Sequence, residues 1–400
     1  MVYRRDMAER SGGHEVRAPR IRRASVVHPP ASAGKGPARP GTVVGVTPQD
    51  AVPPDAVPPD AVPPDAVPPE VARGPWSCRL HVVTGKGGTG KTTAAGALAV
   101  ALATGGRRVL LTEVEGRQQI AQLFDTPPLP YAERKVASAP GGGEVFALAI
   151  DAEEALLEYL EMFYNLRRAG KALGKIGAID FATTIAPGVR DVLLTGKVKE
   201  AVNRPDATRS GGKAYDAVVL DAPPTGRIAR FLNVSAEVAG LAKVGPIRTQ
   251  ADSVMAVMRS ATTAVHFVTL LEEMPIQETV DGVAELKTAG LAVGGVIVNM
   301  IRKPLLAAED IERAGTDKLD LEELAAGVKE AGILPSAELI GALATEAAQH
   351  ARRVRLETAE RAEVEALGRP VYELPLVADG VDVGVIYQFA ELLRTQRMVG

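Results

Sequence analysis

The chain has 400 residues, 46% of them hydrophobic and 24% charged, with a formal net charge of −3. This length can form one large α/β domain or two small ones, and the balanced charge gives no global attraction to nucleic acid or anionic membranes. The single cysteine, Cys78, excludes an intramolecular disulfide and a cysteine-rich zinc or iron–sulfur site within one chain. Because the apolar stretches are also far shorter than the ~20 residues of a membrane span, we expect a cytoplasmic protein that is neither exported nor inserted.

Residues 1–74 are rich in Pro, Ala and Arg, show no apolar periodicity and repeat the pentapeptide DAVPP. Such a composition cannot bury enough apolar surface to fold, so it predicts a disordered, partly polyproline-like tail. The arginines near its start could contact nucleic acid or lipid, but a solvated or mistranslated leader explains them more simply. We assign this tail no function.

Short β-branched runs alternate with helical patterns over the remaining residues, 75–400. Near-continuous apolar strands of this kind are typical of a sheet that is buried on both faces. We therefore predict an α/β fold with a doubly wound, mostly parallel sheet, helices on both faces, and ligands at the carboxyl ends of the strands. The predicted strands are LHVVT, RVLLT, VFALAI, AVVLDA, VHFVTL, GGVIVN and VYELPL.

Two stretches, about 152–204 and 246–263, carry helical patterns in place of this alternation. We expect them to form a helical subdomain beside the sheet. Met255 and Met258 share one helix face in the second stretch, and two explanations stay open for them. They could line a flexible apolar groove for a client protein, or they could be ordinary core residues.

The segment GKGGTGKTT lies between a predicted strand and a predicted helix and fits G-x-x-x-x-G-K-S/T. In this pattern glycines let backbone N–H groups surround phosphates, Lys91 reaches the β- and γ-phosphates, and Thr92 offers a hydroxyl to Mg²⁺. The sequence therefore predicts a P-loop NTPase that binds ATP and Mg²⁺. The predicted nucleotide-binding residues of this loop are Gly85, Lys86, Gly87, Gly88, Thr89, Gly90, Lys91, Thr92 and Thr93.

Asp221 follows the apolar run AVVL at the end of a predicted strand. An acidic residue there is often only a helix cap or a turn former. Beside a phosphate-binding loop, however, it matches the Walker-B carboxylate that holds Mg²⁺ through water and begins a mobile loop. We assign Asp221 to the magnesium site.

Several further blocks resemble the ArsA-type anion-transporting ATPases, which include the arsenical-pump ATPase and the ATPase that targets tail-anchored proteins. The loop GKGGTGKTT resembles their deviant Walker A, although partition, septum-site and nitrogenase iron proteins share it. DAPPTGRIARFL is similar to their switch II segment, with departures at Ala222, Pro223 and Arg227. EEMPIQETVDGVAELKTAGLAVGGVIVN and VYELPL resemble their later blocks, so the resemblance runs from Arg79 to Leu393, and EVEGRQQIAQLF resembles the actinobacterial branch.

The resemblance implies roles for residues that the P-loop pattern does not reach. Asn299 takes the place of the asparagine that reads the purine, and Pro375 lies in the strand that closes over the base. In switch I, Glu115 stands where the family has an Asp that orients the attacking water. The extra methylene shifts this carboxylate and predicts slow hydrolysis. Glu113 is close enough in sequence to compete for the same role.

In related ATPases, the lysine at the position of Lys86 crosses a dimer interface and touches the partner's nucleotide, as an arginine finger does. The resemblance therefore implies a homodimer or a heterodimer with a paralogous ATPase. The catalytic residues so predicted are Lys86, Lys91 and Glu115. A chain with one cysteine lacks both the metalloid ligands and the zinc pair of some relatives, so we expect neither site.

Three functions stay open at this stage. The first is an ATP-driven dimeric switch whose nucleotide state controls capture and release of a protein or membrane client. The second is a weakly hydrolysing regulatory subunit of a heterodimer. The third is a partition- or septum-site-type positioning ATPase at a membrane, for which the segment GVIYQFAELLRTQRM offers helically spaced apolar residues. A core helix explains that spacing as well, and we do not expect nucleic acid as a partner.

Overall fold

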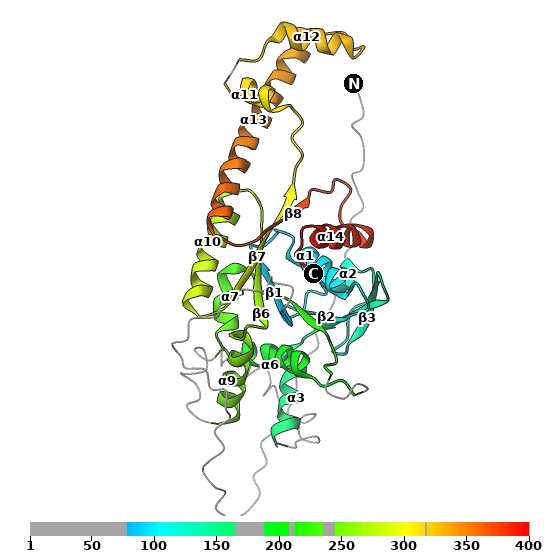
Figure 1. The fold of residues 1–400 in the computed structure, drawn as a ribbon, viewed down its shortest axis with the longest axis vertical. Coiled ribbons are helices and arrows are strands. Elements are labelled where there is room, and N and C mark those ends of the chain that lie inside the picture. Colours follow the sequence, from blue (N-terminus) through cyan, green and yellow to red (C-terminus); the bar gives the residue numbers. More distant parts are fainter. Residues whose placement is uncertain (1–77, 165–187, 208–211, 235–244, 317, 400) are drawn as a thin grey trace, which may run out of the picture. The chain divides into compact units, whose positions relative to one another are not determined.

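The computed structural model describes residues 78–164, 188–207, 212–234, 245–316 and 318–399. The predicted tail and the middle of the first helical stretch lie outside these ranges. Eight strands form one sheet in the order β3-β4-β2-β5-β1-β6-β7-β8 (Figure 1). Every neighbouring pair is parallel except β3 and β4. The strands are β1 (Leu80–Gly85), β2 (Arg108–Glu113), β3 (Arg134–Ala139), β4 (Gly143–Ala149), β5 (Ala217–Asp221), β6 (Thr263–Thr269), β7 (Val293–Ile301) and β8 (Val371–Pro375).

Helices cover both faces of this sheet, which confirms the predicted doubly wound α/β class. On one face α6, α7, α9 and α10 pack on residues such as Leu80 and Val82, and on the other face α1 and α14 pack on Val83. The helices are α1 (Lys91–Ala103), α2 (Gln119–Leu123), α3 (Ala152–Tyr164), α6 (Val189–Asn203), α7 (Thr225–Leu232), α9 (Pro246–Met258), α10 (Glu273–Thr288), α11 (Ala308–Gly315), α12 (Leu321–Glu330), α13 (Ala337–Ala366) and α14 (Val383–Thr395).

The strand order places a topological switch point at the end of β1. The chain leaves β1 toward β2 on one side of the sheet, whereas β6 pairs with β1 on the other side. Ligands of doubly wound sheets bind at the carboxyl end of such a point. The loop after β1 runs from Lys86 to Gly90, so the fold puts the predicted phosphate loop there.

The helix α1 is apolar on every side, and all residues from Ala94 to Ala103 are buried. Small alanines allow a helix of this kind to lie close to its neighbours. Helix α14 packs beside it and buries Ile386, Phe389 and Leu393 in the same core. The C-terminal apolar pattern is therefore that of a core helix, which removes the feature that suggested an interfacial one.

Helices α6 and α9 also pack into the sheet core. Met255 is 4% exposed and Met258 is fully buried, so this pair belongs to the core rather than to an open groove. Helix α9 ends at Met258, before the predicted limit of 263. Because 165–187 lies outside the described residues, the helical subdomain stays a prediction.

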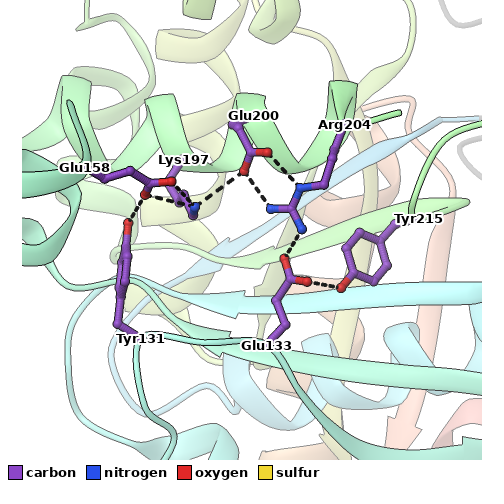
Figure 2. Close-up of polar contacts among 7 residues, drawn as sticks. All are labelled: Tyr131, Glu133, Glu158, Lys197, Glu200, Arg204 and Tyr215. Carbon is purple, nitrogen blue, oxygen red and sulfur yellow. Dashed lines mark hydrogen bonds and ion pairs between the residues drawn. The ribbon is translucent and has the colours of Figure 1, made fainter. Parts of the chain in front are cut away.

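A network of charged and tyrosine side chains fixes α3 and α6 to the edge of the sheet (Figure 2). Lys197 lies 2.8 Å from Glu158, and Arg204 bonds both Glu200 and Glu133. These charges are partly buried, and each has a partner of opposite sign that offsets the cost of its partial desolvation. The network consists of Tyr131, Glu133, Glu158, Lys197, Glu200, Arg204 and Tyr215.

No helix in the described part of the chain has both the length and the apolar character needed to cross a membrane.

Candidate functional site

A cavity of about 450 Å³ opens at the carboxyl ends of β1, β2 and β5. Its walls come from the phosphate loop, the first turn of α1, the segment after β2 and the segment after β5. The cavity is lined by Gly87, Gly88, Gly90, Lys91, Thr92, Thr93, Glu113, Glu115, Arg117, Gln119, Gln122, Leu123, Asp221, Ala222, Pro224 and Val381. It therefore gathers most of the predicted phosphate loop, the predicted magnesium carboxylate and both switch I glutamates.

The phosphate loop is held in shape by its own backbone and by one buried amide. Thr89 donates its hydroxyl to the carbonyl of Lys86 at 2.9 Å, and Asn299 donates its amide to the carbonyl of Thr89 at 2.9 Å. Gly90 has φ +87°, and a Cβ there would lie 2.3 Å from the Asn299 amide. Only glycine fits this position. The loop thus presents the N–H groups of the first turn of α1, which have no helical partner, to the cavity.

Lys91 extends back along this loop toward the cavity. Its ammonium group lies 3.5 Å from the carbonyl of Lys86. Burial lowers the pKa of Lys91, while the nearby carboxylates of Asp221 and Glu115 oppose that effect. A partly desolvated cation beside free backbone N–H groups is a suitable partner for phosphate oxygens.

Thr92 and Asp221 meet across the cavity floor. The hydroxyl of Thr92 lies 2.6 Å from Oδ2 of Asp221 and 3.0 Å from Oε1 of Gln119, so it donates to one of them at a time. Burial raises the pKa of Asp221 to about 6, with the Thr92 hydrogen bond opposing that rise. Glu113 pairs in register with Asp221, is 4% exposed, and has one carboxylate oxygen, Oε1, without a hydrogen-bond partner.

These oxygens fit a magnesium ion. A cation would restore the charged form of Asp221, which burial disfavours, and would compensate the orphaned oxygen of Glu113. Within the described ranges, no three His, Cys, Asp or Glu side chains converge into a metal cage. In nucleotide sites Mg²⁺ commonly binds one or two protein oxygens together with waters and phosphates.

The two switch I glutamates lie in different surroundings. Glu113 ends β2, and its Oε2 accepts a hydrogen bond from the N–H of Ile120 at 3.1 Å, which fixes it in the wall. Glu115 lies 3.8 Å from Arg117 and 3.8 Å from Arg227. Arg227 and Glu115 are both departures from the family pattern, and here they face each other between switch II and switch I.

Some predicted nucleotide residues do not line this cavity. Gly85 is packed against β6, where a Cβ would lie 2.1 Å from the carbonyl of Val268. The contacts of Thr89 and Asn299 support the loop from behind. Pro375 pairs with Ile301 at the end of β8 and lines a different hollow. The structure thus brings the phosphate and metal residues together, while the roles predicted for Asn299 and Pro375 stay predictions.

Lys86 makes an ion pair within its own chain. Its ammonium group lies 2.5 Å from Oε1 of Glu278 on α10, and the other oxygen of Glu278 accepts a hydrogen bond from Thr225 at 2.7 Å. Sequence reasoning gave Glu278 no role, although it lies in the family-like block EEMPIQET. A contact between residues 192 positions apart has no local signal.

A second open region is mostly apolar, with charged side chains at its margins. Hollows of about 810 Å³ and 380 Å³ share Leu306, Leu324 and Ala347 as lining residues. The larger hollow lies between residues 301–306, α13 and the end of β8, and the smaller lies between α11 and α12. None of the residues of α12, all of which are described, is buried. We call this region the apolar hollow.

Comparisons with known proteins agree with the geometry. A family model described as anion-transporting ATPase matches residues 78–262. The chain is 54% identical over 319 residues to the ATPase BagA of Mycobacterium tuberculosis. The aligned region covers 80% of this chain and 93% of that protein. It is 26% identical over 272 residues to the arsenical pump-driving ATPase of Escherichia coli, covering 60% of this chain and 42% of that protein. The match to the ATPase get3 of Schizosaccharomyces japonicus is 28% over 151 residues, covering 38% of this chain and 42% of the relative.

Proposed function

The chain belongs to the anion-transporting ATPase family, and on this basis we propose that it binds ATP with Mg²⁺ in the cavity after β1 and hydrolyses the β–γ phosphoanhydride. The contact between Thr92 and Asp221 at 2.6 Å carries this proposal, because it joins the phosphate loop to the end of β5 as a magnesium site requires. The supporting residues are Lys91 and the glycines of the loop.

The phosphate loop, Lys91, Thr92, Asp221 and Glu115 have separable parts in such a reaction. The loop N–H groups and Lys91 bind the phosphate oxygens and stabilise the charge that develops on them. Thr92, through its hydroxyl, and Asp221, through a water, would hold Mg²⁺, and the ion would supply positive charge that stabilises the phosphates. Glu115 orients the attacking water, while Glu113 keeps its fixed position in the wall.

Fluorescent-nucleotide titration tests the site directly. The full chain should bind an N-methylanthraniloyl ATP with Mg²⁺, and Lys91→Ala should weaken binding at least tenfold. Lys303→Ala is a matched control, since Lys303 is exposed and lines only the apolar hollow. If the Lys91 variant and the parent chain bind the nucleotide with equal affinity, the nucleotide site does not lie in this cavity.

We further propose that the active form is a dimer, in which Lys86 reaches the nucleotide of the partner subunit. The support is the P-loop lysine itself and the partly exposed position of its side chain, which is 31% accessible. The partner is a second copy or a paralogous ATPase. In the second case this chain is the weakly hydrolysing half, for which Glu115 in place of Asp is the motivating feature.

Phosphate release by the chain alone and mixed with the paralogue separates these pairings. Strong turnover of the isolated chain excludes the weakly hydrolysing role. Turnover that appears only in the mixture excludes the homodimer as the active form.

The proposed output is capture and release of a client protein. Its support among the described residues is the apolar hollow, since an open apolar region of this kind is rare on a surface without a binding role. Fluorescence of 8-anilinonaphthalene-1-sulfonate should rise on adding the protein, and Leu306→Glu should reduce the rise. Leu334→Glu, an exposed position outside both hollows, is the control. Equal signals from both variants would leave the client surface elsewhere.

We do not propose a positioning role at a membrane, because the apolar face of α14, which had suggested it, is buried in the core.

A further inference from the structure

The carboxylate of Glu278 contacts two parts of the nucleotide site. Oε1 pairs with Lys86 of the phosphate loop at 2.5 Å, and Oε2 accepts from Thr225, which lies in switch II at the start of α7, at 2.7 Å. The two partners do not bond each other in the described structure.

The helix that carries Glu278 is firmly anchored. Pro275, Ile276 and Thr279 of α10 are buried, and Thr279 donates its hydroxyl to the carbonyl of Pro275 at 2.8 Å. Gly282 lies against the ring of Phe267 in β6, so closely that a Cβ would approach it to 2.7 Å. The carboxylate therefore has a fixed base, whereas both of its partners lie at the ends of loops that line or adjoin the cavity.

The charges support a real ion pair. The hydrogen bond from Lys86 lowers the pKa of Glu278, and the bond from Thr225 acts in the same direction. Glu278 is therefore a carboxylate at neutral pH. The side chains are about one-third exposed, 31% for Lys86 and 34% for Glu278, so the pair can open at modest cost.

We propose that Glu278 is a positioning residue that retains Lys86 on its own subunit and releases it when switch II moves. Thr225 begins α7, four residues after the magnesium carboxylate Asp221, so a rearrangement of switch II on nucleotide binding displaces its hydroxyl from Glu278. The carboxylate then loses one of its two hydrogen-bond partners and its orientation. Lys86 becomes free to reach across an interface. This inference rests on the proposed function, in which Lys86 contacts the partner's nucleotide.

The reactivity of the Lys86 amine reports this retention without needing a partner. The full-length chain is pulse-labelled with an acylating reagent at a concentration that keeps it monomeric, and acylation at Lys86 is quantified by mass spectrometry. Glu278→Gln should raise the labelling rate of Lys86 about fivefold, the range of a partly exposed ion pair. Glu285→Gln, an exposed acid on the same helix, should leave the rate unchanged.

Thr225→Val tests the coupling, because Thr225 does not touch Lys86. Loss of its hydroxyl should also speed labelling of Lys86, by a smaller factor than Glu278→Gln. If Thr225→Val leaves the rate unchanged or lowers it, switch II does not control Lys86, and if Glu278→Gln does the same, the retention itself is wrong. Thermal unfolding of each variant serves as the control that the fold persists.

Failure of the proposed function gives a different pattern, in which the parent chain binds no nucleotide while Glu278→Gln still speeds the labelling of Lys86. If the proposed function holds, Lys91→Ala should weaken nucleotide binding at least tenfold. Adding ATP and Mg²⁺ to the parent monomer should raise Lys86 labelling, and this rise should be absent in Lys91→Ala. A parent chain that binds nucleotide with no change at Lys86 would overturn the release step and leave the ATP site intact.

Discussion

Two buried histidines on the neighbouring strands β1 and β6 make the stability of this fold sensitive to acid. Nε2 of His81 lies 3.1 Å from the carbonyl of Cys78, which can only accept, so this nitrogen carries the proton. Nδ1 of His81 then accepts from Nε2 of His266 at 3.1 Å, and Nδ1 of His266 accepts from the N–H of Gly295 at 3.2 Å. Both rings are neutral in this arrangement, and a proton added to either one removes an acceptor.

The size of the effect follows from the pKa of His81. Burial lowers that pKa from 6.5 to about 4, opposed by the bond to Cys78, and burial also lowers the pKa of His266. A histidine with a depressed pKa in the fold binds its proton only after unfolding, so stability is complete above pH 6.5 and falls as the pH drops toward 4. At about 1.4 kcal/mol per pH unit, His81 alone removes about 2 kcal/mol by pH 5 and about 3 kcal/mol by pH 4.

Urea unfolding at pH 7.5 and pH 5.0 measures this loss. His81→Gln cannot take up a proton, so its free energy of unfolding should fall between the two pH values by about 2 kcal/mol less than that of the parent chain. The carboxylates contribute equally to the two proteins and cancel in the comparison. A parent chain with the same pH dependence as His81→Gln would refute the neutral pair.

Three further predictions concern the cavity and the fold. Asp221→Asn should lower magnesium-dependent turnover 10- to 100-fold. Because burial raises the pKa of Asp221, the same variant should raise the melting temperature of the metal-free chain in calorimetry. A lower melting temperature would contradict the burial argument. In single-turnover assays Glu115→Gln should slow hydrolysis about 100-fold with nucleotide affinity unchanged. If Glu113→Gln slows hydrolysis by this factor and Glu115→Gln does not, the water-orienting role belongs to Glu113. Gly143→Ala should lower the free energy of unfolding in urea by about 3 kcal/mol, because a Cβ there would lie 1.8 Å from the carbonyl of Ala103. An unchanged free energy of unfolding would contradict the close approach of β4 and α1.

The sequence was sufficient for the parallel strands and the phosphate loop because their signals are local. Each buried strand is a short apolar run, and GKGGTGKTT follows the first of them directly. The edge strand β3, RKVASA, was missed because its exposed residues are charged or small and only Ala137 and Ala139 are buried. An edge strand with one covered face has no continuous apolar run.

The long helix α13 and its companions α11 and α12 were missed for a related reason. Of the 30 residues of α13, only Ile340, Ala351, Glu360 and Val364 are buried, so the helix shows no broad apolar stripe. Contacts between residues distant in sequence could not be predicted either. The pairs of Glu278 with Lys86 and of Glu115 with Arg227 join separate blocks, and only the fold brings them together.

The central claim is that the cavity after β1 hydrolyses ATP with Mg²⁺. Steady-state phosphate release by the full chain, alone and with the paralogous ATPase, measured beside Lys91→Ala in the same two settings, tests it most directly. We predict magnesium-dependent release in at least one setting and a loss of at least 100-fold in Lys91→Ala there. Release that does not change with Lys91→Ala, or no release by the parent chain in either setting, would contradict the claim.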